Sequence, residues 1–78
     1  MRLDKFLKVS RLIKRRTVAN EISDKGRVLL NGNVAKPAKQ VNVGDIITIE
    51  YANHTVRAKI LQVPVNNVRE ASSLYELL

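Results

Sequence analysis

The sequence contains no cysteine, no tryptophan and only one histidine. Without cysteine there is no disulfide framework, no thiol nucleophile and no zinc knuckle, and the chain suits a reducing compartment. No apolar run approaches the ~18 residues that a membrane-spanning helix needs. No secretory signal is visible after Met1. We therefore expect a cytoplasmic protein that does not enter a membrane.

Residues with catalytic chemistry are equally scarce. His54 falls in a predicted turn with no nucleophile near it in the sequence, which is typical of a solvated side chain. No two carboxylates have the spacing of a metal site or of an acid–base pair. The three glycines are isolated turn residues and form no phosphate-binding loop. We predict that the protein is not an enzyme and has no catalytic residue, metal or cofactor.

Positive charge, in contrast, is plentiful and unevenly placed. Residues 1–39 hold eleven Lys and Arg against three Asp and Glu, whereas residues 40–78 hold three against four. The two parts carry +8 and −1, which together give the net charge of +7. A charge that serves only solubility is usually spread over the surface. This concentration instead predicts a surface that binds a polyanion.

Two short helices are predicted at the start of the chain. Apolar spacing predicts the first from Leu3 to Val9, with Lys5 and Lys8 on its outer side, followed by a basic connector over 11–16. The second is predicted from Thr17 to Lys25. Thr17 would be its N-cap and Gly26 its left-handed stop. Its inner face would hold Val18, Ala19 and Ile22.

The remaining chain predicts a small sheet for these helices to pack on. Residues 28–30 lead into Asn31-Gly32, a strong hairpin signal. Pro37 makes 36–40 a loop or edge. After a turn at 43–45, alternating apolar residues predict two strands, over 47–51 and 56–60. A last helix is predicted from Val68 to Leu77.

These elements give an α+β fold class: two short N-terminal helices packed on a small twisted antiparallel sheet, with a short C-terminal helix. We divide the chain into a domain over residues 1–62 and a C-terminal extension over 63–78. At 78 residues the chain forms one small domain.

Folded RNA is the polyanion that the residues favour. Arg and Lys form charge-assisted hydrogen bonds to phosphates, and the N-terminus of the second helix adds to the attraction. Only three aromatic residues are present, each at a predicted core position, so single-strand binding by base stacking is not expected. A DNA-reading second helix is disfavoured because it exposes the acids Glu21 and Asp24. Asp4 either pairs with Lys8 or orients Arg2 or Arg16.

The order of motifs resembles the S-four RNA-binding domain family, also called the alpha-L motif. The resemblance covers about residues 1–62. It rests on MRLDKFLKVSRLIKRRTVANEI, Gly26-Arg27-Val28, Leu30-Asn31-Gly32, Val41 and Gly44-Asp45-Ile46. Within the family, the chain is most similar to the small stand-alone members of RqcP type and, less closely, to the fifteen-kilodalton heat-shock proteins.

This resemblance implies a non-catalytic factor of bacterial ribosome-associated quality control. Such factors bind obstructed large ribosomal subunits, contact large-subunit rRNA and P-site peptidyl-tRNA, and support C-terminal alanine tailing by an RqcH-type partner. The alternative is a recycling or ribosome-assembly protein without a role in tailing. We expect a monomer. The implied RNA-binding residues are Arg2, Lys8, Arg11 and Arg16, supported by Lys5, Lys14, Arg15, Thr17, Lys25 and Arg27.

Overall fold

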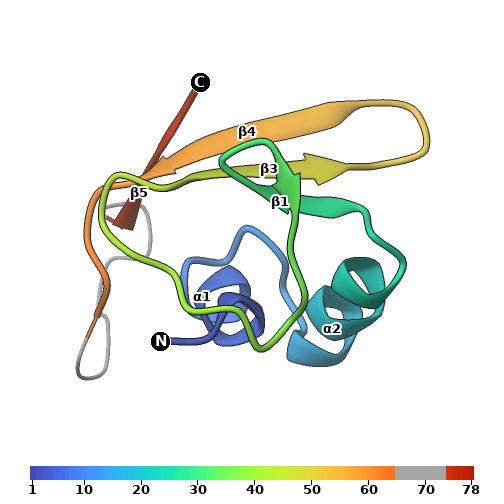
Figure 1. The fold of residues 1–78 in the computed structure, drawn as a ribbon, viewed down its shortest axis with the longest axis horizontal. Helices are drawn as coiled ribbons and strands as arrows, with labels where there is room; N and C mark the ends of the chain where they lie inside the picture. Colours follow the sequence, from blue (N-terminus) through green and yellow to red (C-terminus); the bar gives the residue numbers. More distant parts are fainter. Residues whose placement is uncertain (65–73) are drawn as a thin grey trace.

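The computed structural model describes residues 1–64 and 74–78, with all of their side chains except that of Arg16. Within these residues the chain forms two helices and one sheet (Figure 1). The elements in chain order are α1 (Leu3–Val9), α2 (Arg16–Asp24), β1 (Val28–Leu30), β2 (Asn33–Val34), β3 (Ile46–Glu50), β4 (Thr55–Ile60) and β5 (Tyr75–Leu77).

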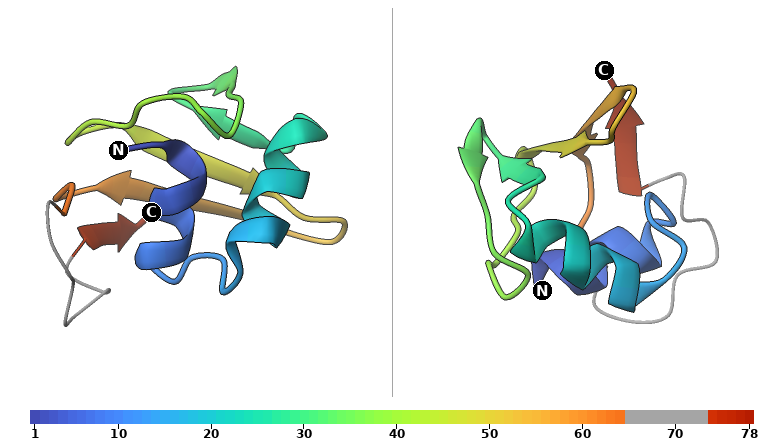
Figure 2. Two further views of the ribbon diagram at one scale, coloured as in Figure 1. Left: turned by 90° about the horizontal axis from the view of Figure 1, so that it is seen from below. Right: turned by 90° about the vertical axis from the view of Figure 1, so that its right-hand side faces the viewer.

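The sheet is antiparallel throughout, with strand order β2-β1-β3-β4-β5. Both helices lie side by side on one face of it, as the two views in Figure 2 show. The core fills the space between the layers, and Phe6 and Leu7 of α1 belong to the same buried cluster as Ile47 and Ile49 of β3. The predicted α+β class and the packing of the two helices on the sheet are therefore confirmed.

The start of α1 is held by a distant loop, and we call this contact the N-terminal clasp. It joins residues 1–4 to residues 37–41. The amide of Leu3 donates to the carbonyl of Lys39 (2.8 Å), and the amide of Asp4 donates to that of Pro37 (3.1 Å). These carbonyls satisfy amides that have no partner inside the first turn of a helix. The predicted loop over 36–40 is thus confirmed, and it acts as the cap of α1.

The α2 helix begins one residue earlier than the sequence predicts. Arg15 occupies the N-cap position, so Thr17 lies inside the first turn and the prediction of a Thr17 cap is wrong. Ala19 is buried as expected, whereas Val18 is 38% exposed and does not belong to the inner face. The C-terminal stop is confirmed, because Gly26 has a φ of +73°, in the left-handed region.

The predicted Asn31-Gly32 turn joins β1 to β2 with φ values of +54° and +85°. Positive φ at both positions matches the type I′ turn that suits the twist of a hairpin. The Asn31 side chain also ties this turn to the next one. Its amide donates to Asp45 Oδ1 (3.0 Å), and its Oδ1 accepts the Ile46 amide (2.9 Å).

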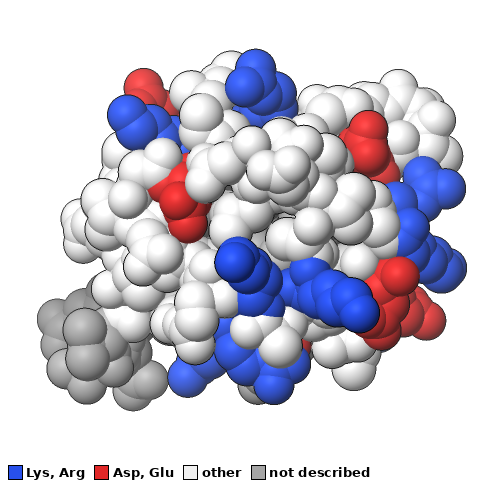
Figure 3. Space-filling view, viewed as in Figure 1, with Lys and Arg blue, Asp and Glu red and all other residues white. Residues whose placement is uncertain are grey.

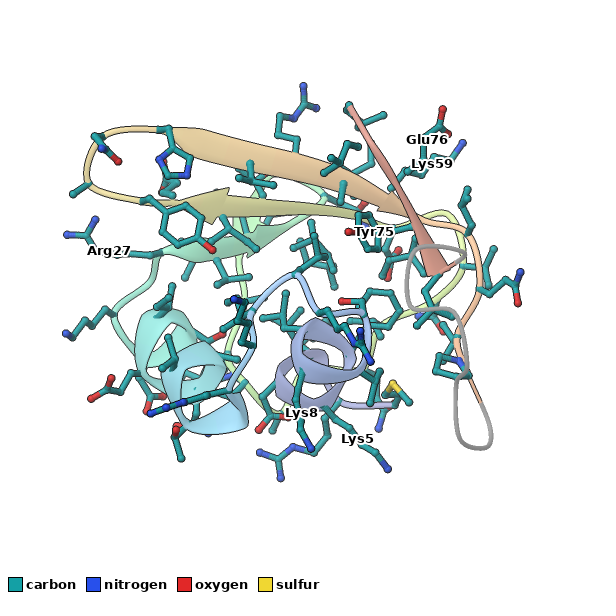
Figure 4. All side chains as sticks on the ribbon, turned by 180° about the vertical axis from the view of Figure 1, so that it is seen from behind. Lys5, Lys8, Arg27, Lys59, Tyr75 and Glu76 are labelled. Atoms are coloured by element: carbon teal, nitrogen blue, oxygen red, sulfur yellow. The ribbon has the colours of Figure 1, made fainter. Side chains whose placement is uncertain are left out.

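The prediction of a C-terminal helix is wrong for residues 75–77, within the part of it that the structure describes. Residues 75–77 form β5, which pairs with β4 through Ile60 and Tyr75, and through Lys59 and Glu76. Figure 4 shows Tyr75 between the sheet and the helices and Glu76 beside Lys59 at the outer side. The first part of that predicted helix, 68–73, lies outside the described residues. The division at residue 62 remains a prediction.

Ser23 gives a test of this packing. It lies in α2 with 2% of its surface exposed, and its hydroxyl has no hydrogen-bond partner among the described residues. Burying an unpaired hydroxyl is unfavourable, and alanine is the better helix former. We expect Ser23→Ala to raise the free energy of unfolding by about 1 kcal/mol. Urea denaturation followed by circular dichroism measures this, and a lower free energy would contradict the packing described.

No helix in residues 1–64 or 74–78 has the length and apolar character needed to cross a membrane.

Candidate nucleic-acid interface

The outer face of α1 presents two lysines to solvent. Leu3, Phe6 and Leu7 face the core with no exposed surface, and this packing fixes the rotation of the helix. Lys5 and Lys8 are therefore exposed on the opposite side. Figure 4 shows both side chains projecting away from the sheet. A helix held in this way can present the two ammonium groups to a phosphate backbone as a fixed pair.

A buried carboxylate organises the start of this face. Asp4 is only 1% exposed. Its Oδ2 accepts a hydrogen bond from Arg2 (3.1 Å) and lies 3.5 Å from Asn20 Nδ2, while its Oδ1 accepts the Lys5 amide (2.8 Å). Of the two roles predicted for Asp4, its contact with Arg2 supports the second, the orientation of Arg2 or Arg16.

A shallow hollow of about 380 Å³ lies beside this carboxylate. It is lined by Arg2, Asp4, Thr17 and Asn20. The hollow brings the first residues of α1 next to the first turn of α2, so Arg2 and Thr17, which are distant in sequence, share one surface. A guanidinium held at the rim of a hollow suits bidentate contact with a phosphate.

The connector between the helices carries three more exposed cations, Arg11, Lys14 and Arg15. Its path is fixed because Ile13 is buried and its amide donates to the Leu7 carbonyl (3.1 Å). Arg16 is the first residue of α2, which places its backbone directly after these cations. We call the exposed cations of α1 and the connector the helical basic face; its residues are Lys5, Lys8, Arg11, Lys14 and Arg15.

Arg11 adopts a backbone conformation that disfavours most side chains. Its φ is +62°, in the left-handed region. Replacing Arg11 with glycine removes both this backbone strain and the positive charge. We expect Arg11→Gly to leave the free energy of unfolding unchanged or to raise it by up to ~1 kcal/mol. RNA affinity should fall, with the slope of log K against log salt smaller by about 1. A binding titration at several salt concentrations measures this, and unchanged binding would remove Arg11 from the interface.

Two predicted RNA-binding residues lie elsewhere. Lys25 is the C-cap of α2 and Arg27 comes directly before β1, and both are exposed. Figure 4 shows Arg27 at the start of β1, far from Lys5 and Lys8. The structure therefore does not bring Lys25 and Arg27 together with the helical basic face.

Sequence reasoning missed two other basic residues. Lys36 and Lys39 are exposed in the loop of the N-terminal clasp, and with the β1–β2 hairpin they line a hollow of about 540 Å³. The clasp places them at the same end of α1 as Arg2. Figure 3 shows several Lys and Arg side chains over the centre and lower part of that view, where the helices and this loop lie, and others at the top and the right edge. Pro37 predicted the loop, but no neighbouring residue in the sequence predicts that this loop packs against the start of α1.

Comparison with known proteins decides the family. The profile of the S4 domain family matches residues 1–47. The chain belongs to the S4 domain family. The predicted resemblance is thus confirmed, because "S-four" is this same family. Its match includes α1, the connector, α2 and the β1–β2 hairpin.

Several proteins are similar to this chain over nearly its whole length. A protein of Listeria innocua named RQC P-site tRNA stabilizing factor is 51% identical over 79 residues, covering 100% of this chain and 86% of the relative. The protein of that name in Bacillus subtilis is 46% identical, covering 100% and 92%. Heat shock protein 15 of Escherichia coli is 36% identical, covering 97% of this chain and 59% of that protein.

Two solved structures share the S4 fold with this chain. The trimeric structure of Vibrio cholerae Heat Shock Protein 15 has a TM-score of 0.89 and 32% identity, covering 100% of this chain and 81% of that one. The solution structure of HP1423 has a TM-score of 0.84 and 34% identity, covering 100% and 96%.

Proposed function

We propose that this chain is a non-catalytic RNA-binding factor, and that the helical basic face is its contact surface. The observation that carries the proposal is the fixed row of exposed cations along α1 and the connector, supported by Asp4 through Arg2. Such cations bind the phosphates of a folded RNA by charge and geometry without reading its sequence. The Lys36–Lys39 loop extends this surface past the start of α1.

We further propose a place in bacterial ribosome-associated quality control. Support comes from the relatives named RQC P-site tRNA stabilizing factor, which are similar over the full chain. The factor would bind obstructed large ribosomal subunits in the cytoplasm and contact both large-subunit rRNA and P-site peptidyl-tRNA. By holding these RNAs in register, a monomer would support alanine tailing of the stalled chain by an RqcH-type partner.

A sucrose gradient of cell lysate tests this proposal. The protein, tagged at its exposed C-terminus, is followed through the fractions while peptidyl-tRNA is probed in each. We expect the protein to sediment with free large subunits that carry peptidyl-tRNA. We also expect it to dissociate from them as the salt concentration is raised. Absence from all ribosomal fractions at low salt would contradict the proposal.

The second candidate is a large-subunit recycling or assembly factor that uses the same surface without a role in tailing. Its support is the similarity to Heat shock protein 15 in both sequence and fold. The same gradient separates the two candidates, because this second role predicts sedimentation with empty or immature large subunits.

A further inference from the structure

The tip of the β3–β4 hairpin carries two stacked rings. Tyr51 follows β3 and His54 precedes β4, and the Tyr51 amide donates to the His54 carbonyl (2.8 Å). This closed turn holds the ring centroids 4.6 Å apart, with 23° between the ring planes. That geometry lies in the range of offset stacking between aromatic side chains.

The two rings differ in their surroundings. Tyr51 is half-buried and packs against the hydrophobic core, so its ring is a fixed support. His54 is exposed, with one face on the phenol ring and the other toward solvent. Its Nδ1 lies 2.8 Å from Asn53 Oδ1. An amide oxygen can only accept, so Nδ1 donates and the imidazole is held in place through its edge.

Positive charge lies at the same end of the molecule. The Glu50 amide donates to the Arg27 carbonyl (2.8 Å), which places Arg27 beside the last residue of β3. Lys25 is two residues away, and both cations are exposed. Figure 4 shows Arg27 projecting at the end of the sheet where the β3–β4 turn lies. Glu50 is also exposed, but strand alternation directs its side chain to the face opposite Tyr51.

We infer that the β3–β4 tip is a second RNA contact, where an unpaired nucleobase stacks on the outer face of His54 and neighbouring phosphates meet Lys25 and Arg27. Histidine serves as a stacking surface for unpaired RNA bases, and such stacking tolerates any base. The inference rests on the proposed RNA-binding function and extends it to a surface apart from the helical basic face. It also gives a role to the two cations that lie away from α1.

Proton NMR tests this directly, because His54 is the only histidine and its ring protons give one isolated set of signals. The full chain is titrated with a short single-stranded oligoadenylate and, separately, with a blunt RNA duplex that has no unpaired bases. A stacked adenine shifts protons under its ring upfield. We therefore expect an upfield shift of the His54 ring signals with oligoadenylate and none with the duplex.

Two variants complete the test. His54→Ala should weaken oligoadenylate binding by roughly five- to a hundredfold, the range found for loss of one stacked base. His54→Phe keeps a stacking face and should retain most of the affinity. If both variants bind as the unaltered chain does, or if the His54 signals stay in place with oligoadenylate, the inference is overturned.

The proposed function is judged by different signals. Amide signals of α1 and the connector report on the helical basic face. If these stay in place with the duplex, that face does not bind RNA backbone, whatever the His54 signals do. A shift of the α1 signals with oligoadenylate but none at His54 would support the proposed function and overturn the inference.

Discussion

Replacing Lys5 and Lys8 together with glutamine is expected to weaken binding to large ribosomal subunits on the order of tenfold to a hundredfold. Both side chains are exposed and stand on a helix whose rotation is fixed by a buried face. With two phosphate contacts fewer, binding also releases fewer counterions from the RNA. The slope of log K against log salt should therefore fall by about 1.4–1.8 for the pair.

A matched variant separates this local effect from the loss of overall charge. Arg57→Gln with Lys59→Gln makes the same change in net charge, from +7 to +5. These two exposed residues lie on β4, and Figure 4 shows Lys59 on the opposite side of the molecule from Lys5 and Lys8. Binding of purified large subunits carrying P-site tRNA is measured for both variants over a range of salt. Equal losses would mean that overall charge, and not the helical basic face, drives binding.

Asp4→Asn is expected to weaken RNA binding even though it removes a negative charge. If Asp4 contributed only its charge, the substitution would strengthen attraction to phosphate. The carboxylate instead holds Arg2 at 3.1 Å and accepts the Lys5 amide at 2.8 Å. Asparagine keeps an acceptor but loses the ion pair. We expect affinity to fall severalfold and the free energy of unfolding to fall by about 1–3 kcal/mol.

Glu21→Gln is the control for Asp4→Asn. It removes one negative charge from an exposed position on α2. RNA affinity should be unchanged or slightly higher in this variant, and stability should change little. The sign of the change in affinity is thus the decisive result. Stronger binding by Asp4→Asn, measured at a temperature where the variant is folded, would show that the carboxylate does not position Arg2.

Local sequence signals predicted the elements whose causes are local. The spacing of Leu3, Phe6 and Leu7 placed α1 at its observed bounds, and Asn31-Gly32 placed the first hairpin turn. These signals work because a helix face or a positive-φ turn depends on a few neighbouring residues. The basic connector was predicted for the same reason. The apolar spacing of α1 stops at its end, and the charged residues that follow are exposed.

Errors arose where a distant segment decides the structure. Residues 74–78 have the apolar spacing of a helix, yet pairing with β4 makes 75–77 a strand. Strand preference depends strongly on such neighbours. The docking of the Lys36–Lys39 loop on α1 and the stacking of Tyr51 on His54 likewise follow from tertiary contacts. For the candidate site, the sequence therefore predicted the exposed cations of α1 and the connector, but it did not predict that Lys36 and Lys39 lie beside the start of α1 or that Lys25 and Arg27 lie apart from it.

The N-terminal clasp also sets when this protein becomes able to bind RNA during its own synthesis. The first turn of α1 relies on carbonyls that lie 33 and 36 positions later in the chain. A helix of seven residues does not persist alone in water. Lys5 and Lys8 therefore leave the exit tunnel on unstructured chain, and they take up their fixed spacing only after residue 41 has followed. The ribosome that makes the protein meets no finished binding surface until this half of the chain has emerged.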